Sequence, residues 1–174
     1  MPLTQFERWT DYGEQCLMKV ITGVLGSWGG NMRCHLFKLI DGDVVDPEME
    51  DLTEADITEA DFTGYALESF GFDPPMDPGG TGEWESIAST ICTFNRRYAV
   101  EPDPGPVDAG TSNTVYGYYL TCNGSGYNAD RPLYYRFFND GTSITAKAMN
   151  TPDVDQITVV PRLGLVGLED VVCP

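Results

Sequence analysis

Hydrophobic residues recur every three or four positions near the amino terminus, and this spacing predicts an amphipathic helix. The apolar stripe contains Leu3, Phe6, Trp9, Gly13, Cys16, Leu17, Val20, Ile21 and Val24. Thr4 and Glu7 have the spacing of a capping box, in which each side chain satisfies a backbone donor at a helix start. We therefore expect a helix that begins near Thr4 and ends near Gly23 or Gly26. Its apolar stripe packs either on its own domain or on a neighbouring subunit.

Beyond Gly30 the pattern changes to short segments rich in β-branched and aromatic residues, separated by glycine, proline, Asn-Gly and Asp-Gly. The expected strands are Met32–Ile40, Phe62–Phe70, Trp84–Phe94, Thr114–Cys122, Leu133–Asn139, Ser143–Ala148 and Gln156–Leu165. Pro161 restricts the last of them to a sheet edge or a bulge, because proline cannot donate a ladder hydrogen bond. Two Pro/Gly-rich loops, Asp73–Gly82 and Glu101–Gly110, interrupt the pattern. The predicted fold class is mainly β: an antiparallel β-sandwich or barrel with an amino-terminal amphipathic helix and long Pro/Gly loops.

The length of 174 residues limits the number of domains. A chain of this size forms one domain, or one domain with an arm. We expect residues 1–30 to form an amino-terminal helical arm and residues 31–174 to form a single β-rich domain. No segment reaches the ~20 apolar residues of a membrane span, and the amino terminus does not resemble a secretory signal. We therefore expect neither a membrane partner nor export.

Acidic residues dominate the charge, with 27 Asp and Glu against 10 Lys and Arg and a net charge of -17. Fifteen of these acids lie between Asp41 and Glu85, and no Lys or Arg occurs from Leu39 to Asn95. A field of this sign repels phosphates, so we expect no nucleic-acid partner. The acid run is a solvated face, a docking surface for a basic partner, or a calcium site. The calcium ligands would be Asp41, Asp43, Asp46, Glu48 and Glu50, which do not follow the EF-hand spacing.

Candidate catalytic groups are scarce in this chain. The five cysteines, Cys16, Cys34, Cys92, Cys122 and Cys173, have no zinc spacing with the single His35. We expect them to be reduced, buried thiols, with one disulfide as the alternative. His35 lies in an apolar run and is expected to be a strand residue rather than a general base. Neither a nucleophile elbow nor a Walker loop occurs, so we expect no enzyme, no cofactor and no metal.

Two local patterns remain. Residues 53–57 (TEADI) are followed at once by residues 58–62 (TEADF), which we interpret as a duplication in the acidic approach to a strand. The tyrosine-rich segments Tyr116–Tyr119 and Tyr134–Phe138 are expected to serve core packing or subunit contacts, with carbohydrate binding as the alternative.

Several blocks, in order between residues 32 and 168, resemble a group of structural proteins of tailed bacteriophages. They are Cys34–Phe37 (CHLF), Leu52–Asp56 (LTEAD), Phe62–Ala66 (FTGYA), Thr93–Asn95 (TFN), Val115–Thr121 (VYGYYLT) and Val159–Leu165 (VVPRLGL). The resemblance implies a virion component rather than an enzyme. It also implies a homo-oligomer, with trimers at symmetry axes as its usual form.

The resemblance and the acidity together favour a capsid cement or decoration protein. Such a protein would be assembled in the bacterial host cytoplasm and would bind the major capsid protein on the capsid exterior, away from the packaged DNA. The expected contact residues are Leu3, Phe6, Trp9, Leu17, Tyr116 and Tyr118. Deletion of residues 1–24 is expected to abolish shell binding and leave the β-domain folded. The alternative is a tail- or fibre-associated module that binds host-surface carbohydrate through its tyrosines and Trp84.

Overall fold

The computed structural model describes residues 7–26, 32–38, 53–62, 65–73, 85–95, 114–139, 143–149 and 156–164. Helix α1 spans Asp11–Ile21, and a single 3-10 turn, η3, spans Glu54–Asp56. The strands are β1 Glu7–Trp9, β2 Met32–Lys38, β3 Thr58–Glu59, β4 Glu68–Phe70, β5 Glu85–Ile87, β6 Cys92–Asn95, β7 Thr114–Val115, β8 Gly117–Cys122, β9 Tyr134–Phe137, β10 Lys147–Ala148, β11 Gln156–Val159 and β12 Arg162–Gly164. The described chain is therefore mainly β, as its sequence predicts.

A six-stranded antiparallel sheet forms the centre of the molecule. Its order is β1-β9-β8-β2-β3, and β4 pairs with the other end of β2. The longest pairing joins β2 and β8, from Met32 opposite Cys122 to Phe37 opposite Gly117. Both strands are almost entirely buried, which explains why their sequences are nearly continuous apolar runs.

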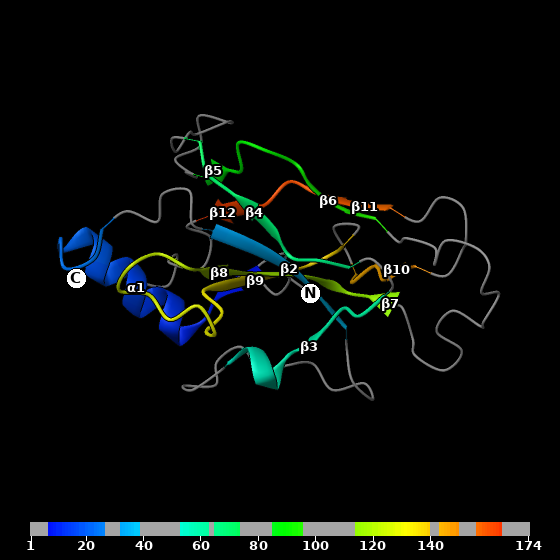
Figure 1. Cartoon of the computed structure of the whole chain (residues 1–174), viewed down its shortest axis with the longest axis horizontal. Helices are drawn as coiled ribbons and strands as arrows, with labels where there is room; N and C mark the ends of the chain where they lie inside the picture. Colours follow the sequence, from blue (N-terminus) through cyan, green and yellow to red (C-terminus); the bar gives the residue numbers. More distant parts are fainter. Residues whose placement is uncertain are drawn as a thin grey trace.

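Three further antiparallel pairs, β5 with β12, β6 with β11 and β7 with β10, accompany this sheet. Figure 1 shows β5, β6, β11 and β12 above the central strands β2, β8 and β9, and β3 with η3 below them. The pairs β5–β12 and β6–β11 are separate because two expected long strands are broken. Trp84–Phe94 is divided into β5 and β6, and Gln156–Leu165 is divided into β11 and β12 around Pro161. The strand predicted to be an edge or a bulge is thus broken at Pro161, and each half lies in a two-stranded pair, where both strands are edges.

Other strand predictions need correction. Thr114–Cys122 is interrupted at Tyr116, whose N–H bonds to Phe37 O at 2.9 Å. Among the described residues of Phe62–Phe70 only β4 is a strand, and within Ser143–Ala148 only β10 is. The two-residue β3 was not expected, because acidic residues are poor strand formers and its pairing with β2 is a tertiary contact.

Side chains alternate between two apolar clusters on the two faces of the central sheet. One face carries the larger cluster, which includes Cys34, Leu36 and Leu120. The opposite face carries Phe37, Tyr119, Tyr135 and Phe137, which we call the aromatic face. Ile57, just after η3, is buried against the aromatic face.

The amino-terminal segment begins differently from the prediction. Glu7, expected in a helix, instead belongs to β1, which pairs with β9. The helix begins after Thr10, whose Oγ1 accepts from Gly13 N–H at 3.0 Å and donates to Pro132 O at 2.6 Å. A predicted capping box is a local preference worth about 1 kcal/mol, and strand pairing with β9 outweighs it here. The predicted end near Gly23 is confirmed, with φ of 73° at that residue.

Residues 7–26 are part of the β-rich body and not a separate arm. The strand β1 is the edge of the central sheet, and Cys16 on α1 belongs to the larger core cluster. Gly13 allows the helix to lie against the chain before β9, since a Cβ there would be 1.9 Å from Leu133 O. Deletion of residues 1–24, which was expected to leave the β-domain folded, would remove β1 and α1 together with their contacts to β9 and to the larger core cluster.

Candidate functional site

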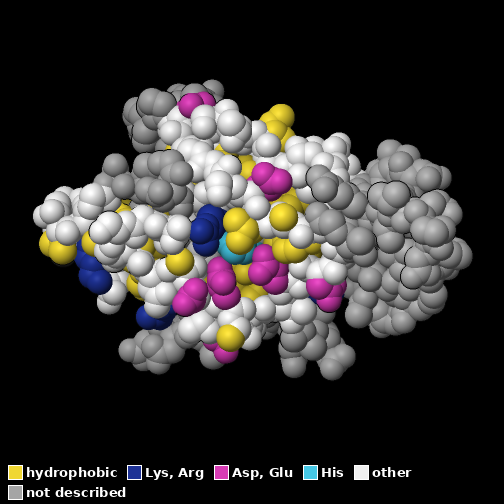
Figure 2. Space-filling view, in the orientation of Figure 1, with side chains coloured by type: hydrophobic (Ala, Val, Ile, Leu, Met, Phe, Trp, Pro, Cys, Tyr) yellow, Lys and Arg dark blue, Asp and Glu magenta, His cyan; other side chains and the backbone are white. Residues whose placement is uncertain are grey.

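Helix α1 has a buried side and an exposed apolar side. Gly13 and Cys16 face the body. Met18, Ile21 and Val24 are 58%, 68% and 71% exposed, and we call them the outer apolar group. Hydrophobic side chains appear at this helical end of the molecule in Figure 2. Met18 and Ile21 lie on α1, and Val24 lies just after its end. We take these exposed apolar side chains as the candidate contact surface.

Of the six residues expected to contact a partner, the structure describes Trp9, Leu17, Tyr116 and Tyr118. Leu3 and Phe6 lie outside the described residues. Trp9 is half-buried and meets the Tyr134 ring edge-to-face at 5.6 Å, and Leu17 is half-buried on α1. Tyr116 is half-buried beside the aromatic face.

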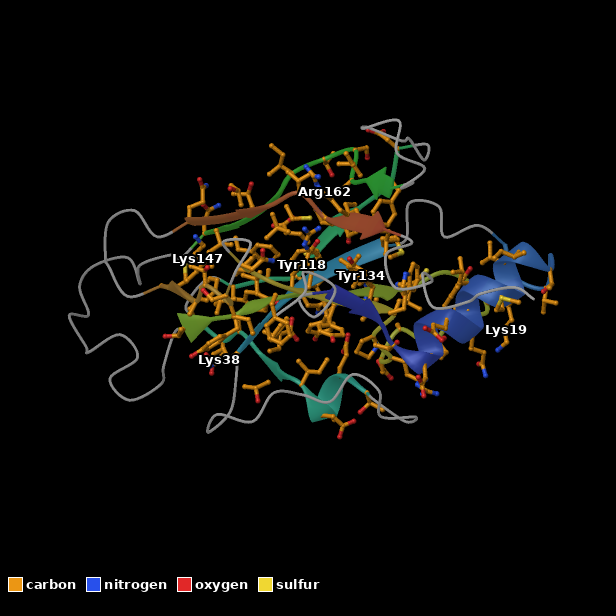
Figure 3. The ribbon with its side chains drawn as sticks, turned by 180° about the vertical axis from the view of Figure 1, so that it is seen from behind. Lys19, Lys38, Tyr118, Tyr134, Lys147 and Arg162 are labelled. Atoms are coloured by element: carbon orange, nitrogen blue, oxygen red, sulfur yellow. The ribbon has the colours of Figure 1, made fainter. Side chains whose placement is uncertain are left out.

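Tyr118, expected at a partner contact, is instead buried in this chain. The residue is only 4% exposed, and its hydroxyl accepts from Arg162 N–H at 3.3 Å. The other tyrosines of these strands, Tyr119, Tyr134 and Tyr135, are also buried. Tyr118 and Tyr134 lie among the strands at the centre of the molecule in Figure 3. The tyrosine-rich strands therefore serve core packing, while Trp84, also expected at a sugar site, lies outside the described residues.

A buried polar cluster surrounds His35 on the aromatic face of β2. His35 is 1% exposed, and its ring stacks on Tyr119 with centroids 4.5 Å apart. Nδ1 lies 2.9 Å from Glu59 Oε1. Nε2 lies 3.1 Å from Thr121 Oγ1 and 3.5 Å from Glu54 Oε1. The sequence prediction that His35 is a strand residue is confirmed, and its partners satisfy both ring nitrogens.

Tyr65 completes this cluster from the chain before β4. Its hydroxyl accepts from Leu36 N–H at 3.0 Å and donates to Glu59 Oε1 at 2.5 Å. Burial, followed by the hydrogen bond to Glu59, raises the pKa of the Tyr65 hydroxyl, which therefore remains a donor. Glu59 thus receives hydrogen bonds from two buried groups.

The two glutamates differ in their ionisation. Burial alone would raise the pKa of Glu59, but hydrogen bonds from His35 and Tyr65 and the charge of His35 lower it below its ordinary value. Burial raises the pKa of Glu54, and the opposing charge of His35 does not cancel this effect. Glu59 is therefore the stronger acid of the pair.

Two acids in the described part of the acid run make contacts within the chain. Asp61 pairs with Lys38, and Asp56 accepts from the backbone N–H and the hydroxyl of Thr53, which caps η3. That Glu54 and Glu59 face one histidine was not predicted from the sequence. The repeat spacing and the single His35 were the available signals. The candidate calcium ligands lie outside the described residues.

Other expected chemistry concerns metals, membranes and thiols. Within the described ranges, no three His, Cys, Asp or Glu side chains gather as metal ligands. No helix there is long and apolar enough to cross a membrane. Cys16, Cys34, Cys92 and Cys122 are free, buried thiols, as predicted for them.

No protein-family model matches the chain, and no curated protein or solved structure matches it at a significant level.

Proposed function

We propose that this protein is a non-enzymatic structural component of a bacteriophage virion, a cement or decoration protein that binds the major capsid protein shell from outside and stabilises it. The observation that carries the proposal is the outer apolar group, Met18, Ile21 and Val24, on a chain of net charge -17. Like charge keeps free copies apart. An exposed apolar group gives the buried contacts that attachment to a shell requires.

The sequence resemblance supports the same class of protein, because its blocks span most of the β-rich body. On this proposal the partner is the major capsid protein, the protein is a homo-oligomer, and it reaches the virion after synthesis in the host cytoplasm. The acid run favours the exterior, since an interior position would place it against DNA phosphates.

We also infer that the body is a β-sandwich. The support is the placement of β5, β6, β11 and β12 over one face of the central sheet (Figure 1), joined by a shared core that includes Phe94, Val159 and Leu163. Such a layer would give the shell a rigid attached domain.

The role is tested by stoichiometry in purified virions. The band of this 19.1 kDa chain on a denaturing gel is compared with the major capsid band. A molar ratio near one, or a simple lattice fraction of it, is expected for a cement protein. A very small ratio, equivalent to a few copies per particle, indicates a tail component. Absence from the particle contradicts any virion role.

The attachment surface is tested with a matched pair of substitutions. Ile21→Ser changes the outer apolar group, and Ile91→Ser changes an isoleucine of similar exposure, 63% against 68%, outside that group. Co-sedimentation with shells of the major capsid protein should weaken at least tenfold for Ile21→Ser and remain unchanged for Ile91→Ser. Equal binding by both variants would remove the outer apolar group from the interface.

A further inference from the structure

The tandem repeat places equivalent glutamates on the two nitrogens of one imidazole. Glu59 of the second copy meets His35 Nδ1, and Glu54 of the first copy meets Nε2. Figure 2 shows Asp and Glu side chains gathered around the histidine. The duplication therefore gives η3 and β3 two attachments to the same residue of β2.

Residues 53–59, which we call the strap, lie across the aromatic face. In Figure 1 η3 and β3 lie below the central strands, and β6 and β11 lie above them. The last two residues of the strap form β3, the edge strand beside β2. Ile57 is the strap's one residue in the aromatic cluster, and the other members come from β2, β8 and β9 or lie beside β8. The strap is therefore the described segment outside β2, β8 and β9 that covers part of this face.

Polar contacts hold most of the strap. None of the η3 residues is buried, and β3 pairs with β2 over only two residues. Glu54 N–H also bonds to Asp130 O at 2.8 Å. After the strap, Ala60 and Phe62 are buried in the larger core cluster on the other face. A segment with one buried apolar side chain next to a firmly packed anchor can open locally while the sheet remains folded.

We propose that the strap is an acid-released cover, held over the aromatic face by the His35–Glu59 contact and freed, without unfolding of β2, β8 and β9, when Glu59 is protonated. Release would expose Phe37, Tyr119 and Ile57 to solvent. The inference concerns the domain itself and does not depend on the virion role.

The charged and titratable neighbours of the His35–Glu59 contact determine whether the closed strap becomes more or less stable as the pH falls. His35 faces Glu59 from β3, Glu54 from η3 and Tyr119 from β8, while Tyr65 reaches it through Glu59. Arg33 on β2 and Asp130 before β9 act on Glu54, and Lys38 and Asp61 pair nearby.

Glu59 and Glu54 contribute with opposite signs. The pKa of Glu59 is lowered in the closed strap, so its stabilisation is present above the free glutamate value of about 4.3 and is lost as the pH falls through the lower, closed-state pKa. The pKa of Glu54 is raised, so the closed strap binds its proton more tightly than the open one. On acidification, Glu54 therefore favours the closed strap and Glu59 favours the open one. The proposal requires the effect of Glu59 to be the larger below about pH 4.3, so that the strap is closed at pH 5 and opens on further acidification.

Hydrogen exchange of the full chain, followed by mass spectrometry, tests the proposal. Protection factors, corrected for the intrinsic pH dependence of exchange, are compared for the strap and for β8 at pH 7, 5 and 3.5. In the wild type, strap protection should fall severalfold, by up to about sixfold, between pH 5 and 3.5, because one carboxyl with a free pKa of about 4.3 supplies no more than this over that interval, while β8 remains protected. Joint loss of protection by the strap and β8 would overturn local release.

Two isosteric variants separate the effect of the His35–Glu59 contact from a general effect of acidic charge. Glu59→Gln should lower strap protection at least tenfold already at pH 7, whereas Glu54→Gln should leave it unchanged or raise it. Unchanged protection in Glu59→Gln, or equal loss in both variants, would contradict the proposal. If Glu59→Gln does not fold, Tyr65→Phe, which removes one donor to Glu59, should show a smaller loss confined to the strap. Full strap protection in Tyr65→Phe at every pH would then contradict the proposal that the His35–Glu59 contact holds the strap closed.

Discussion

Gly13 shows how one residue fixes the position of a helix. A Cβ at this position would lie 1.9 Å from Leu133 O and 2.7 Å from Leu133 C, which are backbone atoms and cannot turn away. The contact requires the smallest residue because α1 approaches the chain before β9 closely. The sequence shows Gly13 within the apolar stripe, but the neighbour that requires it is 120 residues away.

Gly13→Ala should therefore destabilise the protein, although alanine is the better helix former. We expect a loss of about 1–3 kcal/mol, the usual cost of overpacking, measured from urea unfolding midpoints. Gly26→Ala is the control, because a Cβ there meets nothing within 4 Å. Equal stability of Gly13→Ala and the wild type would show that α1 can move away at no cost.

Leu36 and Ile91 form a second contrast at the residue scale. Leu36 is fully buried in the larger core cluster, whereas Ile91 is 63% exposed. Leu36→Ala should cost about 2–5 kcal/mol, because it removes buried methyl groups and leaves a cavity. Ile91→Ala should change stability by less than about 0.5 kcal/mol. Thermal unfolding followed by circular dichroism would measure both, and similar losses would contradict the burial assigned to β2.

The polar cluster marks the limit of prediction for single residues. The apolar run around His35 predicts a strand, and this is confirmed. Its partner Glu59 is 24 residues away and comes from a two-residue strand that no local pattern indicates. Which carboxylate reaches a histidine depends on strand register, and register is a property of the assembled sheet.

At the scale of elements, local signals located most strands but not their ends. The apolar runs of β2, β8 and β9 were found because burial on both faces produces long hydrophobic segments. The missing backbone donor of Pro161 predicted an edge strand or a bulge, and the strand is in fact divided there into two edge strands, β11 and β12. The helix start was misplaced, because the Thr4–Glu7 spacing mimics a cap while Glu7 pairs across the sheet with Arg136.

The pairing of β1 with β9 leads to a prediction about truncation. Deletion of residues 1–9 removes the edge strand and the Trp9 contact with Tyr134. We expect a lower melting temperature and concentration-dependent association, since β9 becomes an exposed edge. A chain that starts at residue 7 is the control, because it keeps β1. Unfolding by calorimetry and size by light scattering would decide, and wild-type behaviour of the deletion would restore the idea of a separate arm.

For the whole molecule, composition predicted the fold class, but the pairing of distant strands could not be predicted. The aromatic, β-branched and turn-forming residues indicated an antiparallel β protein, and the described strands are antiparallel. The placement of the pairs β5–β12 and β6–β11 beside the central sheet was not predictable. It depends on contacts such as that of β6 with β11, between residues more than 60 positions apart. The exposure of Met18 was likewise hidden, since a helical pattern shows that a residue is apolar but not which neighbours cover it.

The net charge of -17 yields a last prediction, in which salt acts in opposite directions on folding and on attachment. Like charges repel one another in the compact state, and added salt screens this repulsion. The melting temperature should therefore rise between 10 mM and 500 mM NaCl. If the acid run docks on a basic patch of the shell, the same salt should weaken binding, because it screens the attraction between the partners. The pair of measurements is informative because apolar attachment through Met18, Ile21 and Val24 alone would not weaken with salt. Binding that stays constant or strengthens would assign attachment to the outer apolar group and leave the acid run as a solvated face.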